Sequence, residues 1–194
     1  MRYSICVSGA ANGKTVKSSQ ELAERVGRAI AESGHILTTG ATVGLPFFAA
    51  KAAKAAGGMS IGFSPASSLR EHAYKYRLPI GVYDFVNFTG MHYVGRDVHL
   101  VQSSDAIITV GGRIGSMHEF TTALESNMPC GVLLGSGGAA DFIPELLEHL
   151  EVPRRKLVVF DDDPEKLVQK IIAILDDDLK DIDTDDLVTK WLSQ

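Results

Sequence analysis

Several features that mark whole classes of protein are scarce or missing in this sequence of 194 residues. It has two cysteines, Cys6 and Cys130, which form no CxxC pair and lie in apolar stretches, so we expect buried core thiols and no disulfide framework. The six histidines show no HExxH or other ligand spacing. We therefore expect no metal site and no resident cofactor.

The sequence also lacks the patterns that indicate nucleic-acid or membrane partners. It has no run of lysine and arginine and a net charge of −5, whereas proteins that neutralise phosphate backbones usually carry a basic stripe. It has no apolar run of 18 residues, and no basic and then apolar leader pattern precedes the first strand. We expect a cytoplasmic protein without nucleic-acid or membrane partners.

What the chain does contain is an alternation of short apolar runs with helical periodicity. The apolar runs predict strands over residues 3–9, 35–40, 59–65, 82–90, 105–112, 130–138 and 156–160. The periodic segments predict helices over 18–34, with serine caps at its start, and over 45–58, 93–104, 116–127, 141–150 and 164–177. The polar segment 66–79 separates the third strand from the fourth.

Strands that are apolar on both faces and separated by helices predict a mainly parallel sheet with helices on both sides, because parallel neighbours need a crossover connection. The fold class is therefore α/β, a Rossmann-like three-layer sandwich. The composition, 45% hydrophobic and 22% charged, suits one compact domain. We place that domain at residues 1–175, followed by an acidic tail at 176–194 with a short helix that carries Trp191.

Four of the predicted strands end in loops of small residues, at 8–15, 38–44, 111–116 and 135–138. Such loops at the carboxyl edge of a parallel sheet favour a phosphate-bearing ligand, because glycines let backbone N–H groups approach an anion. The first loop ends in Gly13, Lys14 and Thr15, but only three residues separate Gly9 from Gly13, which excludes a P-loop. The second loop does not match G-x-G-x-x-G and lacks the acidic residue of a dinucleotide site.

The segment TTGATVGLPFFAAKAAKAAGGMSIGFSPA, residues 38–66, resembles the Lonely Guy (LOG) family, whose pattern is roughly GGGxxGLMGxxAxAAxxxGGxxIGVxP. The segment GGRIGSMHE, residues 111–119, resembles that family's P-G-G-x-G-T-x-x-E signature. Arg96 lies 23 positions before Glu119, as does the arginine of the family's M-H-x-R-K segment. The resemblance spans residues 5–150 and implies a superfamily that also includes nucleotide phosphoribohydrolases and molybdenum cofactor carriers.

The resemblance implies that Glu119 and Arg96 are catalytic and that the protein is at least a dimer. The glycine-rich loops and the helix start that follows the fifth strand predict the remaining ligand contacts. The residues predicted to bind the ligand or its phosphate are Gly9, Gly40, Gly44, Gly111, Gly112, Arg113, Gly115 and Ser116.

The sequence departs from the family pattern at several of these positions. Gly111 replaces the proline, Arg113 the second glycine and Ser116 the threonine of the signature, and Asp97 replaces the lysine after Arg96. Arg113 has two interpretations, a phosphate clamp or an outward salt-bridge partner. The substitutions indicate a divergent branch whose substrate need not be the family's.

Glu119 has two interpretations as well. Ser116 and Glu119 have the spacing of a capping box, in which the carboxylate would only close the helix start. Alternatively, Glu119 would stabilise an oxocarbenium-like ribose and deprotonate the attacking water. Arg96 would then orient the ligand or Glu119, and otherwise it would be a solvated helix residue. We expect the adjacent His118 to point away from the site, because neighbouring helical positions lie about 100° apart.

The predicted function is nucleotide binding, with hydrolysis of the N-glycosidic bond of a nucleoside 5′-monophosphate. The alternative is a non-catalytic carrier or sensor of a nucleotide or pterin-type cofactor, and a third hypothesis is an interaction module without a ligand. The predicted partners are a small nucleotide-like phosphate ligand and further copies of the chain, in a dimer or tetramer. His72, Tyr74 and Tyr76 lie either in a ligand pocket or in a surface loop.

Overall fold

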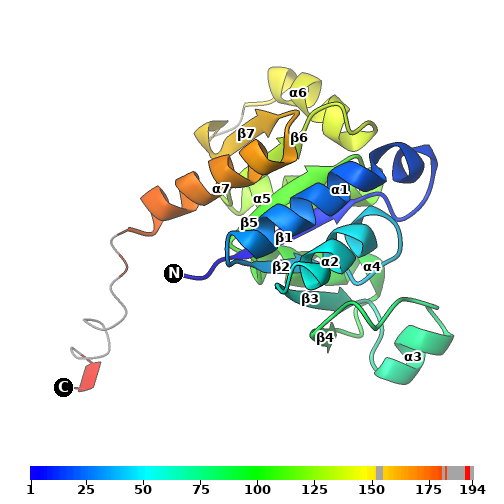
Figure 1. Ribbon diagram of the computed structural model, residues 1–194. Helices are drawn as coiled ribbons and strands as arrows, with labels where there is room; N and C mark the ends of the chain where they lie inside the picture. The colour runs from blue at the N-terminus through cyan, green and yellow to red at the C-terminus, as the bar shows by residue number, and fades with distance from the viewer. Residues whose placement is uncertain (152–154, 181, 183–190, 193–194) are drawn as a thin grey trace.

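The computed structural model describes residues 1–151, 155–180, 182 and 191–192. Most of the predicted acidic tail lies outside the described residues, and of its predicted helix only Trp191 and Leu192 are described, as helical. The described part forms a single sheet of parallel strands with helices on both faces, which confirms the predicted α/β fold (Figure 1).

The sheet contains seven strands in the described part of the chain, in the spatial order β4-β3-β2-β1-β5-β6-β7, and all neighbouring pairs are parallel. The strands are β1 (Ser4–Gly9), β2 (Ile36–Thr39), β3 (Met59–Ser64), β4 (Phe85–Phe88), β5 (Ala106–Val110), β6 (Cys130–Leu133) and β7 (Val158–Asp161). The chain first builds outward from β1 to β4 and then returns to the other side of β1 with β5. The order of the strands therefore reverses between β1 and β5.

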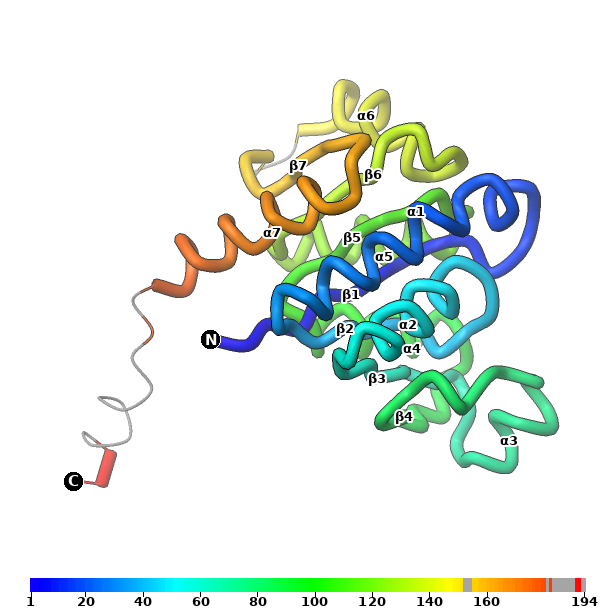
Figure 2. Tube along the Cα trace, in the orientation of Figure 1, coloured from blue at the N-terminus to red at the C-terminus, as the bar shows by residue number. Residues whose placement is uncertain are grey.

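The helices are α1 (Lys14–Glu32), α2 (Leu45–Ala55), α3 (Leu69–Tyr74), α4 (His92–Gln102), α5 (Ile114–Glu125), α6 (Ala139–His149) and α7 (Pro164–Asp178). A short 3₁₀ turn, η1 (Arg155–Leu157), precedes β7. In the tube of Figure 2, α1 lies between α2 and α7 along the same face of the sheet. The opposite face is covered by α4, α5 and α6, whose apolar residues share a core with the sheet.

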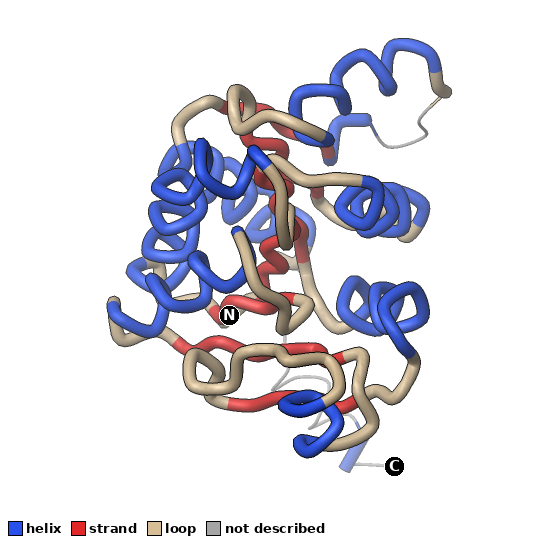
Figure 3. The backbone as a smooth tube through the Cα atoms, turned by 90° about the vertical axis from the view of Figure 1, so that its right-hand side faces the viewer, coloured by secondary structure: helices blue, strands red, loops and turns tan. Residues whose placement is uncertain are grey.

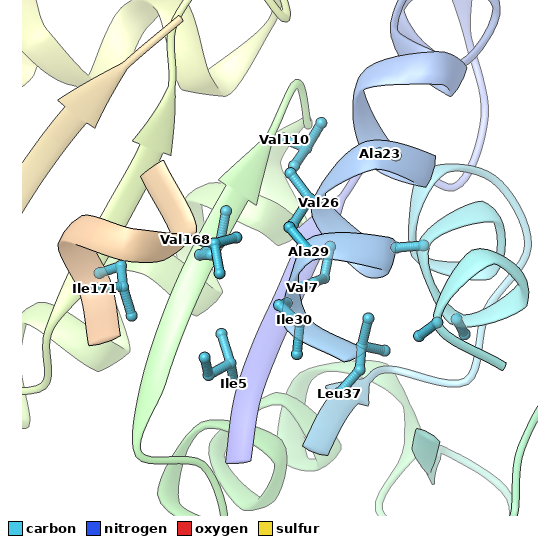
Figure 4. Close-up of a cluster of buried hydrophobic side chains, with 14 of the residues drawn as sticks. Ile5, Val7, Ala23, Val26, Ala29, Ile30, Leu37, Val110, Val168 and Ile171 are labelled. Atoms are coloured by element: carbon cyan, nitrogen blue, oxygen red, sulfur yellow. The ribbon is translucent and has the colours of Figure 1, made fainter. Parts of the chain in front are cut away.

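On the face covered by α1, side chains of the helices pack directly onto the strands, which explains why the strands are continuous apolar runs. Val26 and Ile30 of α1 pack onto Ile5 and Val7 of β1, and Ile171 of α7 belongs to the same cluster (Figure 4). All five side chains are fully buried. Because both faces of the sheet are covered in this way, the central strands carry no polar face.

Helix α1 begins at Lys14, four residues before the predicted serine caps. Gly13 occupies the cap position with a φ of 103°, and no side chain among the described residues caps the helix start. Ser18 and Ser19 lie inside the helix instead, and their hydroxyls donate to the carbonyls of Thr15 and Ser136. The predicted start was wrong because the chain turns at Gly13 and enters the helix there, so that both serines lie inside the helix and their hydroxyls donate to carbonyls.

Helix α3 was not predicted in the polar segment that follows β3. Ser68 caps it by accepting a hydrogen bond from the backbone N–H of Glu71 over 3.2 Å, and the Glu71 carboxylate accepts from the N–H of Ser67 over 2.7 Å. This is a variant of the capping box. The S-x-x-E spacing in the sequence was the signal that would have predicted this helix.

The two buried cysteines match their prediction as core thiols. Cys6 and Cys130 are free and fully buried. Burial raises the pKa of both thiols, and that of Cys130 to about 12, because the thiolate would lose its hydration.

Candidate functional site

A cavity of about 470 Å³ opens at the carboxyl edge of the sheet, between the loop after β1 and the turn after β5. Gly9 of β1 lies opposite Val110 of β5 in the parallel register, so both strands end side by side at this edge. Figure 3 views the molecule from the side toward which β1 runs, with the loops in tan. The strand order reverses at this point, which is where open parallel sheets bind their ligands. The residues that line the cavity are Val7, Gly9, Ala10, Ala11, Asn12, Gly40, Thr42, Pro46, Tyr93, Arg96, Asp97, Arg113, Ile114, Gly115, Ser116 and Glu119.

The turn between β5 and α5 is built by Gly111 and Gly112, whose φ angles are 58° and 105°. Their carbonyls accept hydrogen bonds from the start of α6, from Ala140 N over 2.9 Å and from Ala139 N over 3.1 Å. A Cβ on Gly112 would lie 2.6 Å from the Cβ of Ser116. The two glycines hold the turn from outside the cavity lining, and their part in phosphate binding stays a prediction.

Helix α5 begins at Ile114, two residues before the predicted start. Arg113 is its cap residue, in an extended conformation, and no side chain in the described part of the chain caps the helix. The backbone N–H of Met117 donates to Arg113 O over 3.0 Å, so the amides of residues 114–116 have no acceptor within the helix. Gly115 and Ser116 line the cavity at this point. The start of α5 therefore presents free N–H donors and the positive end of the helix dipole to the cavity.

Glu119 does not cap this helix. Its Oε2 accepts a hydrogen bond from Ser8 Oγ, and its Oε1 accepts one from Arg96 Nη1 over 3.3 Å. The capping-box interpretation was wrong, because α5 starts at Ile114 and places both Ser116 and Glu119 inside the helix. Glu119 is 8% exposed and lines the cavity.

Arg96 lies between two carboxylates in the interior and is not a solvated helix residue. It is 4% exposed, and its Nη1 is 3.3 Å from Glu119 Oε1 and 3.3 Å from Asp97 Oδ1. Its Nε is buried and has no hydrogen-bond partner among the residues that the structure describes. The guanidinium crosses Gly40 at the end of β2, where a Cβ would come within 1.9 Å of Nη1. Gly40 therefore supplies the space in which Arg96 reaches Glu119.

Burial raises the pKa of Glu119 from its ordinary 4.5 to about 7, because the ionised carboxylate is removed from water. The positive charge of Arg96 acts against this rise, and the negative charge of Asp97 adds to it. The hydrogen bond from Ser8 favours the ionised form and lowers the pKa. A pKa raised into this range suits a group that exchanges protons near neutral pH.

Ser8 and Asp97 belong to this cluster, although no sequence pattern predicted a role for either. Both are buried, at 1% and 5% exposure. His118 was expected to point away from the site, but its Nδ1 lies 3.0 Å from Asp97 Oδ2, although it does not line the cavity. Two signals could have identified them. Ser8 is a small polar residue at the end of an apolar strand, and Asp97 is an acidic residue beside the predicted arginine.

The other predicted ligand residues lie around the same edge. A Cβ on Gly9 would be 2.8 Å from Val110 O, so the close approach of β1 and β5 requires glycine there. Gly44, with a φ of 81°, packs against Ala10 O and does not line the cavity. Arg113 is exposed at the rim, and its Nη1 donates to the side-chain oxygen of Asn12 in the loop after β1.

The polar segment contributes little to the cavity. His72 is fully buried and hydrogen-bonded to Ser64 over 2.8 Å, so it has a structural role. Tyr74 is 78% exposed. The ring of Tyr76 lies 5.6 Å from that of Tyr93, which lines the cavity. Of His72, Tyr74 and Tyr76, only Tyr76 lies near the site, through its contact with Tyr93.

The described residues include no cluster of three or more histidine, cysteine, aspartate or glutamate side chains that could hold a metal ion. They also include no helix with the length and apolar character needed to cross a membrane.

Comparison with known proteins finds related sequences and solved structures. An uncharacterized protein of Archaeoglobus fulgidus is 35% identical over 113 residues, which are 58% of this chain and 69% of the relative. The molybdenum cofactor binding protein of Rippkaea orientalis has a similar structure, with a TM-score of 0.73 and 26% identity over 90% of this chain and 98% of that one. The molybdenum cofactor carrier protein of Chlamydomonas reinhardtii gives a TM-score of 0.71 and 26% identity over 90% and 99% of the two chains.

The fold also occurs in a DNA-binding protein. DNA processing protein A of Helicobacter pylori, a single-stranded DNA binder, gives a TM-score of 0.61 and 17% identity over 88% of this chain and 80% of that one. At this identity the likeness concerns the fold alone.

The family comparison covers most of the described chain. Residues 2–168 match the SLOG cluster4 family, and this range contains all seven strands and the whole cavity. Together with the two carrier-like neighbours, this match confirms the predicted relation to the LOG and molybdenum cofactor carrier superfamily. The chain belongs to the SLOG cluster4 family.

Proposed function

We propose that the protein binds a nucleoside 5′-monophosphate in the cavity between β1 and β5 and hydrolyses its N-glycosidic bond. The observation that carries this proposal is the buried pair of Glu119 and Arg96 in the wall of a cavity whose rim is the uncapped start of α5. The cavity is large enough for such a ligand, since small-molecule sites usually measure about 300–1,000 Å³.

The distribution of charge around the cavity supports this ligand class. The start of α5 and the guanidinium of Arg113 place positive charge at the rim, which suits a 5′-phosphate. In the wall, Glu119 and Asp97 share one guanidinium, so the buried cluster carries an excess of negative charge when both carboxyls are ionised. A ligand with an anionic phosphate would match the positive rim, and a sugar that becomes electron-poor during the reaction would match the acidic wall.

Cleavage of an N-glycosidic bond produces such an electron-poor centre. As the bond from ribose C1′ to the base nitrogen breaks, the ribose ring becomes oxocarbenium-like, and the electron pair leaves with the base. The ionised carboxylate of Glu119 would stabilise this charge and accept a proton from the water whose oxygen bonds to C1′. The departing base takes up a proton, and the products are the free base and ribose 5-phosphate. Arg96 would orient Glu119 and keep a fraction of it ionised at neutral pH.

The second candidate function is a non-catalytic carrier of a nucleotide or pterin-type cofactor. Two observations favour it: the solved neighbours include a molybdenum cofactor carrier protein, and both oxygens of Glu119 already accept hydrogen bonds within the protein. In this role the same loops would bind the phosphate of the cargo, and no bond would be broken.

Incubation with AMP, GMP, CMP and UMP, followed by chromatography for free base and ribose 5-phosphate, distinguishes these functions. We expect release of base by the wild type and a loss of at least about a hundredfold in Glu119→Gln, which removes a general base while keeping the side-chain size. Glu125→Gln, at an exposed position at the end of the same helix, is the matched control. Melting temperatures that rise with nucleotide while no base appears would establish the carrier function instead.

We further propose that the protein acts as a homo-oligomer in the cytoplasm, on a small molecule and not on nucleic acid. Two free thiols suit a reducing compartment, and the net charge of −5 disfavours a polyanion. Helix α4 also exposes apolar side chains, Val94 at 70% and Val98 at 37%. Light scattering coupled to size-exclusion chromatography, and a titration with labelled single-stranded DNA, test the assembly and the partner.

A further inference from the structure

Arg113 spans the mouth of the cavity. It follows β5, and its Nη1 donates to the side-chain oxygen of Asn12, which belongs to the loop after β1. Both residues line the cavity and both are exposed. The contact therefore joins the loop after β1 to the turn after β5, both of which line the cavity.

Arg113 makes this contact with Asn12 without distorting or blocking the backbone at the start of α5. As the cap residue of α5, Arg113 has φ −135° and ψ −160°, an extended conformation open to any residue, so the position does not require glycine. The backbone of the first helical turn remains accessible: a Cβ built on Gly115 would meet no atom within 4 Å, although Gly115 lines the cavity. The guanidinium and the bare helix start are thus available to the same ligand.

The partner that holds Arg113 is weak compared with a phosphate. Asn12 offers a neutral amide oxygen, and the contact is exposed to water. A dianionic phosphate offers several oxygens to a guanidinium in a bidentate geometry, and hydrogen bonds between two charged groups are roughly twice as strong as neutral ones. A phosphate at the start of α5 would therefore be a stronger partner for Arg113 than Asn12 is.

A second observation in the same cavity indicates that a polar ligand belongs there. The Nε of the buried Arg96 has no partner among the described residues, and Arg96 lines the cavity. A buried donor without an acceptor is unfavourable, so a ligand acceptor that reaches it would be stabilised.

We propose that Arg113 is a phosphate clamp that Asn12 holds across the mouth of the cavity, and that it selects phosphorylated ligands by exchanging Asn12 for the ligand's dianionic phosphate. This proposal rests on the proposed phosphate site at the start of α5. It does not depend on hydrolysis, since the clamp would act in the same way in a carrier.

Ribose 5-phosphate is the probe of choice, because it tests the phosphate site without knowledge of the base. Isothermal titration calorimetry should show that Arg113→Gly, which restores the family residue, weakens its binding roughly tenfold or more, as loss of a charge-assisted contact predicts. Arg113→Lys keeps the charge without the bidentate geometry and should fall between wild type and Arg113→Gly. Arg28→Ala, at an exposed arginine on α1 outside the cavity, is the matched control and should bind like wild type.

Asn12→Ala distinguishes two roles of Arg113: binding the ligand's phosphate, or only holding the two loops together through Asn12. We expect this variant to bind ribose 5-phosphate about two- to tenfold more tightly, because Arg113 no longer gives up a partner. A weakening equal to that of Arg113→Gly would show that the contact only holds the loops together, and would overturn the proposal. Unchanged binding by Arg113→Gly, with its melting temperature intact, would also overturn the clamp.

The failure of the clamp can be told from the failure of the proposed function. If wild type binds ribose 5-phosphate but releases no base from any nucleotide, hydrolysis fails and the Arg113 and Asn12 variants still decide on the clamp. If wild type releases base and Arg113→Gly binds equally well, only the clamp fails. If wild type binds neither ribose 5-phosphate nor a nucleotide at millimolar concentration, the phosphate site and the clamp are both wrong.

Discussion

Arg96 and Glu119 are 23 residues apart in the chain and meet in the interior, with Nη1 of the arginine 3.3 Å from Oε1 of the glutamate. Each comes from a different helix on the same face of the sheet, α4 and α5. Asp97 approaches the same Nη1 to 3.3 Å. Two carboxylates thus compete for one buried guanidinium, and this competition makes the protonation of Glu119 sensitive to its neighbours.

The bare backbone at Gly115 leads to the first prediction. Gly115→Ala should fold at least as well as wild type, because the new Cβ meets no atom, Gly115 does not have a positive φ, and replacing glycine at such a position stabilises by about 0.4–1 kcal/mol through the unfolded chain. It should nevertheless weaken ribose 5-phosphate binding, because Gly115 lines the cavity and the methyl group adds bulk at the bare start of α5. Gly81→Ala, where a Cβ also meets nothing and which lies outside the cavity, is the control. Equal binding by both variants would show that no ligand approaches Gly115.

The raised pKa of Glu119 predicts how stability depends on pH. Its folded pKa is about 7 and its ordinary value 4.5, so between these values the folded protein holds a proton that the unfolded chain releases. The stabilisation from this proton is fully present below pH 4.5 and is lost as the pH rises to about 7. In Glu119→Gln this contribution is absent.

The measurement is the melting temperature of wild type and Glu119→Gln across this pH range. The wild-type value should fall relative to the variant as the pH rises. The comparison cancels other groups, including His35, whose pKa is lowered by burial and whose contribution has the opposite sign. A constant difference between the two proteins from pH 4.5 to 7 would contradict a raised pKa.

The fold was more predictable than the site. Each predicted strand overlaps an observed one, although β7 ends one residue beyond its predicted range. The apolar runs of the central strands reflect burial on both faces of the sheet, which is a local property of the sequence. The starts of α1 and α5 were misplaced, because the chain turns at Gly13 and Gly112 with positive φ and begins each helix before the serines that looked like caps. A serine or threonine caps a helix only where it stands immediately before the first helical turn, and the position of that turn is set by the backbone.

The site was predictable only in part, because its contacts join distant elements. Glu119 and Arg96 were identified by resemblance, and both line the cavity. The hydrogen bond from Ser8 to Glu119 joins residues that are 111 positions apart in the sequence. It depends on how α5 packs against β1, which no local sequence pattern encodes. The pairing of Asp97 with His118 likewise depends on the packing of α4 against α5.

Removal of Asp97 should lower the pKa of Glu119. The negative charge of Asp97 raises that pKa, and without it Glu119 would have Arg96 to itself. The variant Asp97→Asn keeps the shape and should shift the titration of the Glu119 carboxyl carbon, followed by NMR with Glu119→Gln for assignment, to lower pH. An unchanged or higher midpoint would mean that Asp97 does not act on Glu119.

Removal of the Ser8 hydroxyl should have the opposite effect. Ser8 Oγ donates to Glu119 and thereby favours the ionised form, so Ser8→Ala should raise the pKa of Glu119. The same NMR titration measures this shift. Ser60→Ala removes another buried hydroxyl, one that donates to Val82 O and does not line the cavity, and should leave the Glu119 titration in place.

Gly40→Ala should act on the site through Arg96. The backbone at Gly40 does not have a positive φ, so alanine introduces no backbone strain, but its Cβ would lie 1.9 Å from Arg96 Nη1. The guanidinium must move away from Glu119, and overpacking of this kind destabilises by about 1–3 kcal/mol. Because Arg96 lowers the pKa of Glu119, its displacement should also raise that pKa further.

A double-mutant cycle of chemical denaturation tests this route. If the cost of Gly40→Ala arises from the clash with the guanidinium, it should largely disappear in an Arg96→Ala background, which gives a coupling energy of about 1 kcal/mol or more between the two positions. Additive effects would show that the methyl group at residue 40 disturbs some other neighbour. In that case the space above Gly40 would not be what allows Arg96 to reach Glu119.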